Sequence, residues 1–147
     1  MNFDFSQKDQ AFFGEIVHLL HKVFPENDLE HADTGQAEDR TRVALEQLGS
    51  TGYLKLGVVS DGKGLPDFHT MMGAMEVLSG FSQSLFLSVE MSARLFSRII
   101  AAWAPPGEKQ RWLDPLLNGR LLGAVALSEK TMNVENDPLA TEGILDG

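Results

Sequence analysis

The side chains that could do chemistry are few and widely spaced in this chain of 147 residues. Cysteine is absent, which excludes thiolate catalysis, disulfide bonds and cysteine-ligated metal centres. None of the serines lies in a Gly-x-Ser-x-Gly turn, so the sequence contains no nucleophile elbow. His18 and His21 lie three residues apart in a predicted helix, but two histidines make an incomplete metal site. We therefore interpret both as surface histidines.

Two further segments match ligand-binding patterns only in part. Residues 61–64, Asp-Gly-Lys-Gly, are rich in glycine but lack the longer spacing and the following Ser or Thr of a phosphate-binding loop. They predict a turn. Residues 26–39 contain six acidic side chains and no basic one, without the alternating ligands of a calcium loop. A metal or cationic-partner site is one interpretation of this stretch, and a solvated loop or helix start is the one we favour.

The net charge of −9 comes from 12 basic and 21 acidic residues, and most of the excess lies in the first 39 residues. Nucleic acids and anionic membranes attract basic patches, so we expect neither as a partner. No apolar run approaches the roughly 18 residues that a membrane-spanning helix needs. The first five residues also lack the basic and then apolar segments of a signal peptide. These features predict a cytoplasmic protein without a membrane span.

The spacing of apolar residues predicts helices along most of the chain. The first is expected to begin with a capping box formed by Ser6 and Asp9 and to end near Phe24, before Pro25. One later helix has apolar residues around most of its circumference, which predicts a central helix surrounded by the others. The expected helices cover residues 6–24, 39–48, 65–80, 84–103 and 108–117.

Two segments predict extended structure instead. Residues 53–59 alternate in polarity and predict a short strand or an extended segment. Asn118 and Gly119 are expected to close the last helix in left-handed conformations. The apolar run of residues 121–127 follows and predicts a buried strand. One strand cannot satisfy its own backbone hydrogen bonds, so it requires partner strands.

These elements predict an all-α fold class, a helical bundle with the start of a β domain at its C-terminal end. Residues 1–119 are expected to form a helical N-terminal domain. Residues 120–147 are expected to begin a middle β domain that the chain truncates.

The order and spacing of several short motifs resemble the acyl-CoA dehydrogenase family. Residues 107–119, GEKQRWLDPLLNG, are similar to the family helix with a charged run, an aromatic residue, Leu-x-Pro-Leu and a closing Gly. The family then has a strand ending in Thr-Glu-Pro, where residues 128–130 here are Ser-Glu-Lys. Residues 45–53 resemble the family's Leu-Gly-x-x-Gly turn, and Glu76 falls where its next helix has Glu-Glu-Leu.

The resemblance implies the N-terminal part of an FAD-dependent acyl thioester dehydrogenase, an oxidoreductase of fatty acid metabolism. In this family a Glu removes the α proton and the β hydride passes to flavin N5, which gives a 2-enoyl thioester. That Glu belongs to a C-terminal bundle, so the resemblance implies no catalytic residue in this chain and no activity of the chain alone. It also implies a homo-oligomer in the full-length form and an electron-transfer protein as the acceptor.

The resemblance further implies three residues that contact FAD. Ser128 matches the Thr of Thr-Glu-Pro, whose hydroxyl and backbone approach the flavin ring. Val125 and Leu127 match neighbouring positions whose backbone faces the flavin.

Four residues of the predicted central helix match positions that line the acyl pocket in the family. The favoured alternative is that these four are ordinary core residues. Val134 belongs to the implied substrate site because it stands where the family has the Ser of Gly-Ser-Asp. The four helix residues are Leu87, Ser88, Met91 and Leu95.

The loop after the predicted strand departs from the family pattern. Lys130 replaces a Pro, and Val134 has no hydrogen-bonding group where the family has a Ser. The thioester carrier, CoA or an acyl carrier protein, therefore stays open. A second hypothesis is a degenerate, non-catalytic relative that serves as a helical binding or assembly domain. A third is a helical bundle that matches the pattern by chance, which the lack of a strand after Gly119 would favour.

Overall fold

A computed structural model describes residues 4–25, 34–58, 68–126, 128 and 141–144. These residues are helical and contain no strand, in agreement with the all-α class. A 3₁₀ turn, η1, follows the second helix, and a π-helical segment, η2, lies between the fourth and fifth. The elements are α1 (Gln7–Val23), α2 (Thr34–Thr51), η1 (Tyr53–Lys55), α3 (Phe68–Phe81), α4 (Gln83–Glu90), η2 (Met91–Phe96), α5 (Ser97–Trp103) and α6 (Pro106–Leu117).

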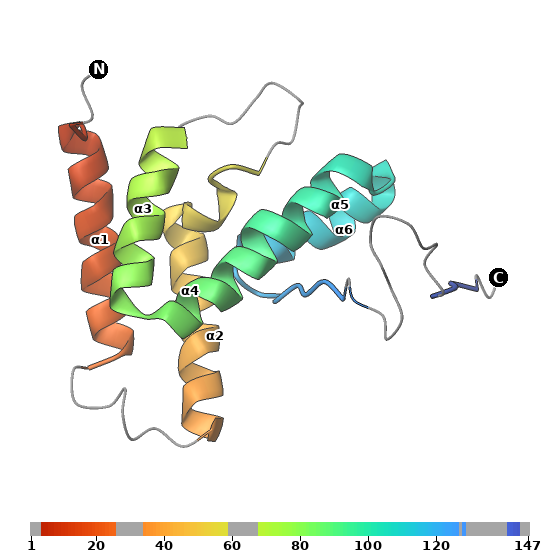
Figure 1. The fold of residues 1–147 in the computed structure, drawn as a ribbon, viewed down its shortest axis with the longest axis horizontal. Helices are drawn as coiled ribbons and strands as arrows, with labels where there is room; N and C mark the ends of the chain where they lie inside the picture. Colours follow the sequence, from red (N-terminus) through yellow and green to blue (C-terminus); the bar gives the residue numbers. More distant parts are fainter. Residues whose placement is uncertain (1–3, 26–33, 59–67, 127, 129–140, 145–147) are drawn as a thin grey trace.

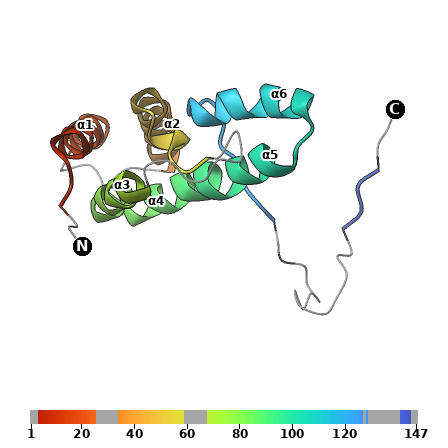
Figure 2. The same cartoon turned by 90° about the horizontal axis from the view of Figure 1, so that it is seen from above.

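The helices form two layers. In Figure 2, α1, α2 and α6 lie side by side in one layer, and α3, α4 and α5 lie in the other. Figure 1 shows that α4 and α5 follow each other along one axis, with η2 between them, as a single long helix. Helix α1 packs against α2 and α3, and α5 packs against α6. Among the described residues, the long helix therefore has a covering layer on one side only.

Hydrogen bonds fix the start of α1 as the sequence predicts. The Ser6 hydroxyl accepts from the Asp9 N–H at 3.2 Å, and the Asp9 carboxylate accepts from the Ser6 N–H at 3.0 Å. The Thr70 hydroxyl also donates to Asp9, at 2.6 Å, which ties α1 to the first turn of α3. The bonds from Ser6 and then Thr70 hold the pKa of Asp9 below its ordinary value. The predicted capping box is confirmed.

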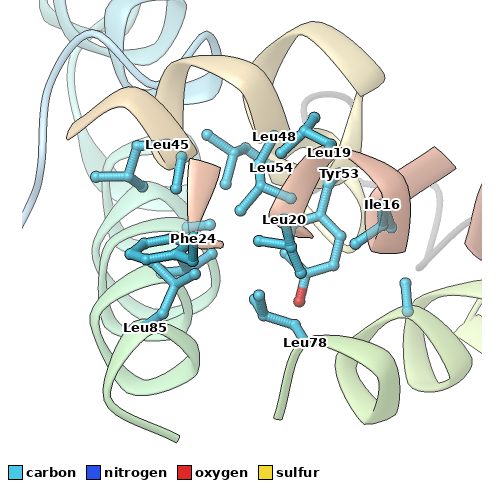
Figure 3. Packing of buried hydrophobic residues seen from close by; sticks show 14 residues of the cluster. Ile16, Leu19, Leu20, Phe24, Leu45, Leu48, Tyr53, Leu54, Leu78 and Leu85 are labelled. Carbon is cyan, nitrogen blue, oxygen red and sulfur yellow. The ribbon is translucent and has the colours of Figure 1, made fainter. Parts of the chain in front are cut away.

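The core lies between α1, α2, η1, α3 and α4 (Figure 3). Leu20 of α1, Leu48 of α2 and Leu78 of α3 are fully buried there. Burying one such side chain contributes roughly 1.5–3 kcal/mol to folding. The three- and four-residue spacing of α1 is thus confirmed as a core stripe. The cluster comprises Ile16, Leu19, Leu20, Phe24, Ala44, Leu45, Leu48, Tyr53, Leu54, Ala74, Leu78, Leu85, Val89 and Ala93.

The extended segment predicted over residues 53–59 is wrong where the structure describes it. Gly52, in a left-handed conformation with φ of 86°, ends the helical path of α2, and η1 follows. Tyr53 and Leu54 are both buried. Successive residues of a strand face opposite sides, whereas a tight 3₁₀ turn allows this pair to enter one core.

The helix boundaries differ from the prediction mainly at α2. It begins at Thr34, five residues earlier than expected, and ends at Thr51. The long helix covers the predicted range, but the helices that the structure describes do not surround it as expected, because they cover it from one layer. The predicted turn at residues 61–64 and the acids at 26–33 lie outside the described residues.

The segment after α6 differs from the prediction in two respects, the conformation of Asn118 and the predicted strand. Gly119 has the predicted left-handed conformation, with φ of 71°, but Asn118 has φ of −99°. A Cβ at position 119 would overlap the carbonyl of Leu45, so the end of α6 sits directly on the backbone of α2. The predicted strand is absent from its described part, residues 121–126, because no neighbouring strand is there to take its hydrogen bonds.

Candidate functional site on the outer face of the long helix

The side of the long helix that faces away from the other layer carries a row of apolar side chains at four-residue spacing. Leu87 is 60% exposed and Met91 43%, while Leu95 is half-buried. Ile99 is 38% exposed and Trp103 84%. Large apolar side chains exposed together are typical of a surface that binds an apolar partner or ligand. We call these five residues the outer row.

The π-helical segment keeps the outer row on one side of the helix. In an α-helix, four residues turn about 40° beyond a full circle, so a row of five would drift by about 160°. The π turn inserts one extra residue, which takes back about 100° of that drift. The Ser97 N–H bonds to the Ser92 carbonyl, five residues back, and the Ser97 hydroxyl donates to the same oxygen at 2.9 Å.

The structure corrects the core interpretation for two of the four predicted acyl-pocket residues. Leu87 and Met91 are exposed in the outer row rather than packed in the core. Leu95 is half-buried in the same row, and Ser88 is half-buried beside it. The Ser88 hydroxyl donates to the carbonyl of Ser84 at 3.0 Å, so it is engaged within its own helix.

The segment that follows α6 crosses the long helix at η2. Figure 2 shows this segment running from the layer of α6 past α5 and out on the other side. The Gly123 N–H donates to the Ser92 hydroxyl at 2.9 Å in a buried contact. A Cβ at position 123 would overlap the ring of Phe96, so only glycine fits. Of the predicted flavin-contacting residues, Val125 is half-buried and Ser128 is exposed.

Two predicted site residues cannot be compared with the structure. Leu127 and Val134 lie outside the described residues. The backbone groups of residues 124–126 make no hydrogen bond within the described part of the chain. These groups are therefore available to a neighbouring strand or to a ligand.

A largely buried polar cluster lies on the side of the long helix that faces η1. The Tyr53 hydroxyl donates to the Glu90 carboxylate at 2.8 Å. The Arg94 guanidinium lies over the Tyr53 ring, 4.9 Å from its centroid, and donates to the Tyr53 carbonyl at 3.1 Å. Arg94 Nε also lies 3.5 Å from Glu90 Oε2. The cluster therefore joins η1 to the long helix through two side chains one turn apart.

The charges of this cluster are strongly affected by their surroundings. Burial raises the pKa of Glu90 above its ordinary value, although the Arg94 charge and the Tyr53 hydroxyl lower it in part. Burial and the neighbouring Glu90 carboxylate raise the pKa of Tyr53 as well, so the phenol stays protonated. Because the Glu90 carboxylate contacts both the Tyr53 hydroxyl and the Arg94 guanidinium, we interpret the cluster as a structural connection.

Sequence reasoning missed the Tyr53–Glu90–Arg94 cluster. Its signal was present as Glu and Arg four residues apart inside a strongly apolar helix, a spacing that places both on one face. The third member could not be found in this way, because Tyr53 lies 37 residues before Glu90.

Other candidate sites give weaker arrangements. The structure brings together no group of three His, Cys, Asp or Glu side chains that could hold a metal ion, within its described residues. His18 and His21 are exposed, and His21 packs edge-on against Phe81. A groove of about 540 Å³ lies between α2 and residues 119–122, but it includes none of the predicted site residues.

Comparisons with known proteins assign no family. No family model, no curated protein and no solved structure matches this chain. Across the described ranges, every helix also falls short of the length and apolarity that crossing a bilayer demands.

Proposed function

We propose that this chain is the N-terminal helical part of an FAD-dependent acyl thioester dehydrogenase and is inactive by itself. The observation that carries the proposal is the exposure of Leu87 and Met91. These are positions that the resemblance to acyl-CoA dehydrogenases assigns to the acyl pocket, and exposed apolar side chains there suit the binding of a fatty acyl chain. Each methylene that such a chain buries contributes about 0.8 kcal/mol.

In this proposal the outer row forms one wall of the acyl site. Its five residues are apolar, so the wall binds the chain and excludes water but supplies no acid or base. The proton-abstracting Glu then belongs to another part of the full-length protein. Acyl-CoA and acyl carrier protein thioesters both fit an apolar wall, since they share the acyl chain.

The crossing segment has groups that fit FAD. Residues 124–126 have unpaired backbone groups, and the hydroxyl-bearing Ser128 is exposed. In the proposal, the backbone at Val125 and Leu127 and the hydroxyl of Ser128 hold the cofactor beside the acyl site. The cofactor, when bound, supplies the hydride acceptor.

The test uses the longest polypeptide that the natural gene containing this chain encodes, which we call the natural product. We expect that product to bind flavin and to reduce a dye when given acyl-CoA or acyl carrier protein thioesters, added in parallel. The 147-residue chain alone should do neither. A natural product that contains no flavin, or a short chain that oxidises acyl thioesters, would contradict the proposal.

A matched pair of variants tests the outer row in the same product. Leu87→Ala should raise KM for a long-chain thioester by about ten- to a hundredfold, because the lost side chain is worth about 1.5–3 kcal/mol of apolar contact. Flavin content should not change. The control is Val43→Ala, which removes an exposed apolar side chain from α2, outside the row. Equal KM values for both variants would contradict a role of Leu87 in acyl binding.

A second candidate is a non-catalytic relative that acts as a helical binding or assembly domain. One observation favours it: Lys130 and Val134 depart from the family loop. The lack of a strand in residues 121–126 favours instead the third hypothesis, a helical bundle that matches the family pattern by chance. For this candidate, the natural product is expected to be free of flavin and to form a stable oligomer, which light scattering after size exclusion would measure.

A further inference from the structure

We infer that Ser92 and Gly123 are positioning residues that seat the crossing segment on η2 and so direct Val125 and Ser128 toward the flavin. The seating concerns this chain alone. Its last step, toward the flavin, rests on the proposed function.

The first observation is the hydrogen bonding of Ser92. This side chain is 2% exposed, in a helix whose inner positions are mostly apolar. A buried hydroxyl is costly unless it is hydrogen-bonded, and the Gly123 N–H is its partner at 2.9 Å. The Ser92 hydroxyl thus accepts a hydrogen bond from a buried backbone N–H that lies 31 residues away in the chain.

The second observation is that the Ser92 hydroxyl lies in the π-helical turn of η2, where the helix is wider than an α-helix. The Ser92 carbonyl accepts both the N–H and the hydroxyl of Ser97, which is fully buried. These two bonds stabilise the widened turn, because they replace the usual bond to the residue four positions away. Ser97 therefore maintains the turn from which Ser92 reaches the crossing segment.

The third observation is the absence of a side chain at position 123. A Cβ there would overlap Cβ, Cγ and Cδ1 of Phe96. Gly123 does not have a positive φ, so its role is close approach and not an unusual backbone conformation. The Phe96 ring and the Ser92 hydroxyl together fix both the distance and the register of the segment against η2.

Amide hydrogen exchange of the 147-residue chain tests the seating. Ser92→Ala should make the Gly123 amide exchange at least tenfold faster, because its buried acceptor is lost. The control is Ser50→Ala, which removes an exposed hydroxyl that bonds only within α2, at 2.6 Å to the Gln47 carbonyl. Unchanged exchange of Gly123 in Ser92→Ala would overturn the inference.

A double variant separates seating from general damage. Gly123→Ala should also accelerate exchange at position 123, since its methyl group meets the Phe96 ring. Adding Phe96→Ala removes Cγ and Cδ1, the two closest of these contacts, and leaves Cβ, so the amide at position 123 should exchange more slowly in the double variant than in Gly123→Ala. If the amide at position 123 exchanges as fast in the double variant as in Gly123→Ala, or faster, the assignment of Gly123 is overturned.

The flavin step is tested in the natural product. Ser92→Ala should lower the flavin bound per chain or shift the flavin absorption spectrum, whereas Ser50→Ala should do neither. Faster Gly123 exchange with unchanged flavin content and spectrum would overturn the positioning role. A flavin-free natural product would overturn the proposed function and this last step together, while the exchange experiment would still decide the seating.

Discussion

Two ion pairs in this protein have the same local geometry and opposite surroundings. Glu38 and Arg42 on α2, and Glu90 and Arg94 on the long helix, are each four residues apart with a nitrogen–oxygen distance of 3.5 Å. The side chains of the first pair are 74% and 69% exposed, and those of the second are 11% and 10% exposed. Sequence spacing therefore determines that the two side chains pair, but burial determines how much the pair contributes to stability.

The exposed pair is solvated and contributes little, as is usual for surface ion pairs. The buried pair has given up its water and depends on Tyr53 for compensation. Its two side chains bond to the Tyr53 hydroxyl and carbonyl, which offsets part of the cost of desolvation. Within the described residues, Glu90 Oε2 and the Nε and Nη1 atoms of Arg94 are buried without a hydrogen bond.

The largest expected difference comes from removing one cation of each pair. Arg94→Met keeps most of the side-chain volume but leaves Glu90 buried without its counter-charge. We expect the free energy of unfolding to fall by about 3–5 kcal/mol. Arg42→Met, the matched change on α2, should lower it by less than about 1 kcal/mol. Urea unfolding at pH 7 measures both, and similar losses would contradict the comparison.

The next comparison uses two leucines of α4 that lie two residues apart. Leu85 is 4% exposed in the core, and Leu87 is 60% exposed in the outer row. Leu85→Ala should lower the free energy of unfolding by about 3 kcal/mol, through lost burial and the cavity left behind. Leu87→Ala should change it by less than about 0.5 kcal/mol. A large loss for Leu87→Ala would show that the outer row is packed in solution.

The smallest effect is a pH dependence from Glu90. Its pKa is raised above 4.5, so between 4.5 and the raised value the folded state binds more protons there than the unfolded state. Stability from this group is full below 4.5 and falls as the pH rises through that window. Glu90→Gln cannot titrate, so the wild-type free energy of unfolding minus that of Glu90→Gln should decrease with rising pH.

Urea unfolding at several pH values between 4 and 8 measures that difference. The matched control is Glu38→Gln on the exposed pair, for which we expect less than about 0.5 kcal/mol of change at each pH. A difference for Glu90→Gln that is constant or grows with pH would show that Arg94 outweighs burial.

The sequence was sufficient where structure depends on near neighbours. Helix α1 was predicted because its capping residues, Ser6 and Asp9, and its core stripe act within a few residues. The end of α6 was predicted at Gly119 for the same reason. The predicted left-handed conformation of Asn118 was wrong, because only Gly119 needs that conformation to close the helix.

The sequence was insufficient where distant contacts decide. The conformation of η1 depends on Glu90 and Arg94, which lie 37 and 41 residues from Tyr53. Exposure of Leu87 depends on how many layers cover the long helix, which apolar content cannot show. The π turn depends on Ser97 and on a segment that returns more than 20 residues later. The family assignment and its cofactor stay predictions.

The close contact of Gly119 with Leu45 has a mechanical consequence when it is combined with the contact at Gly123. A segment held at one residue can rotate about that contact, whereas a segment held at two residues has a fixed direction. The two contacts lie four residues apart, one on α2 and the other on η2, in different layers. A force that pulls on residues 119–123 would therefore be shared between the two helical layers.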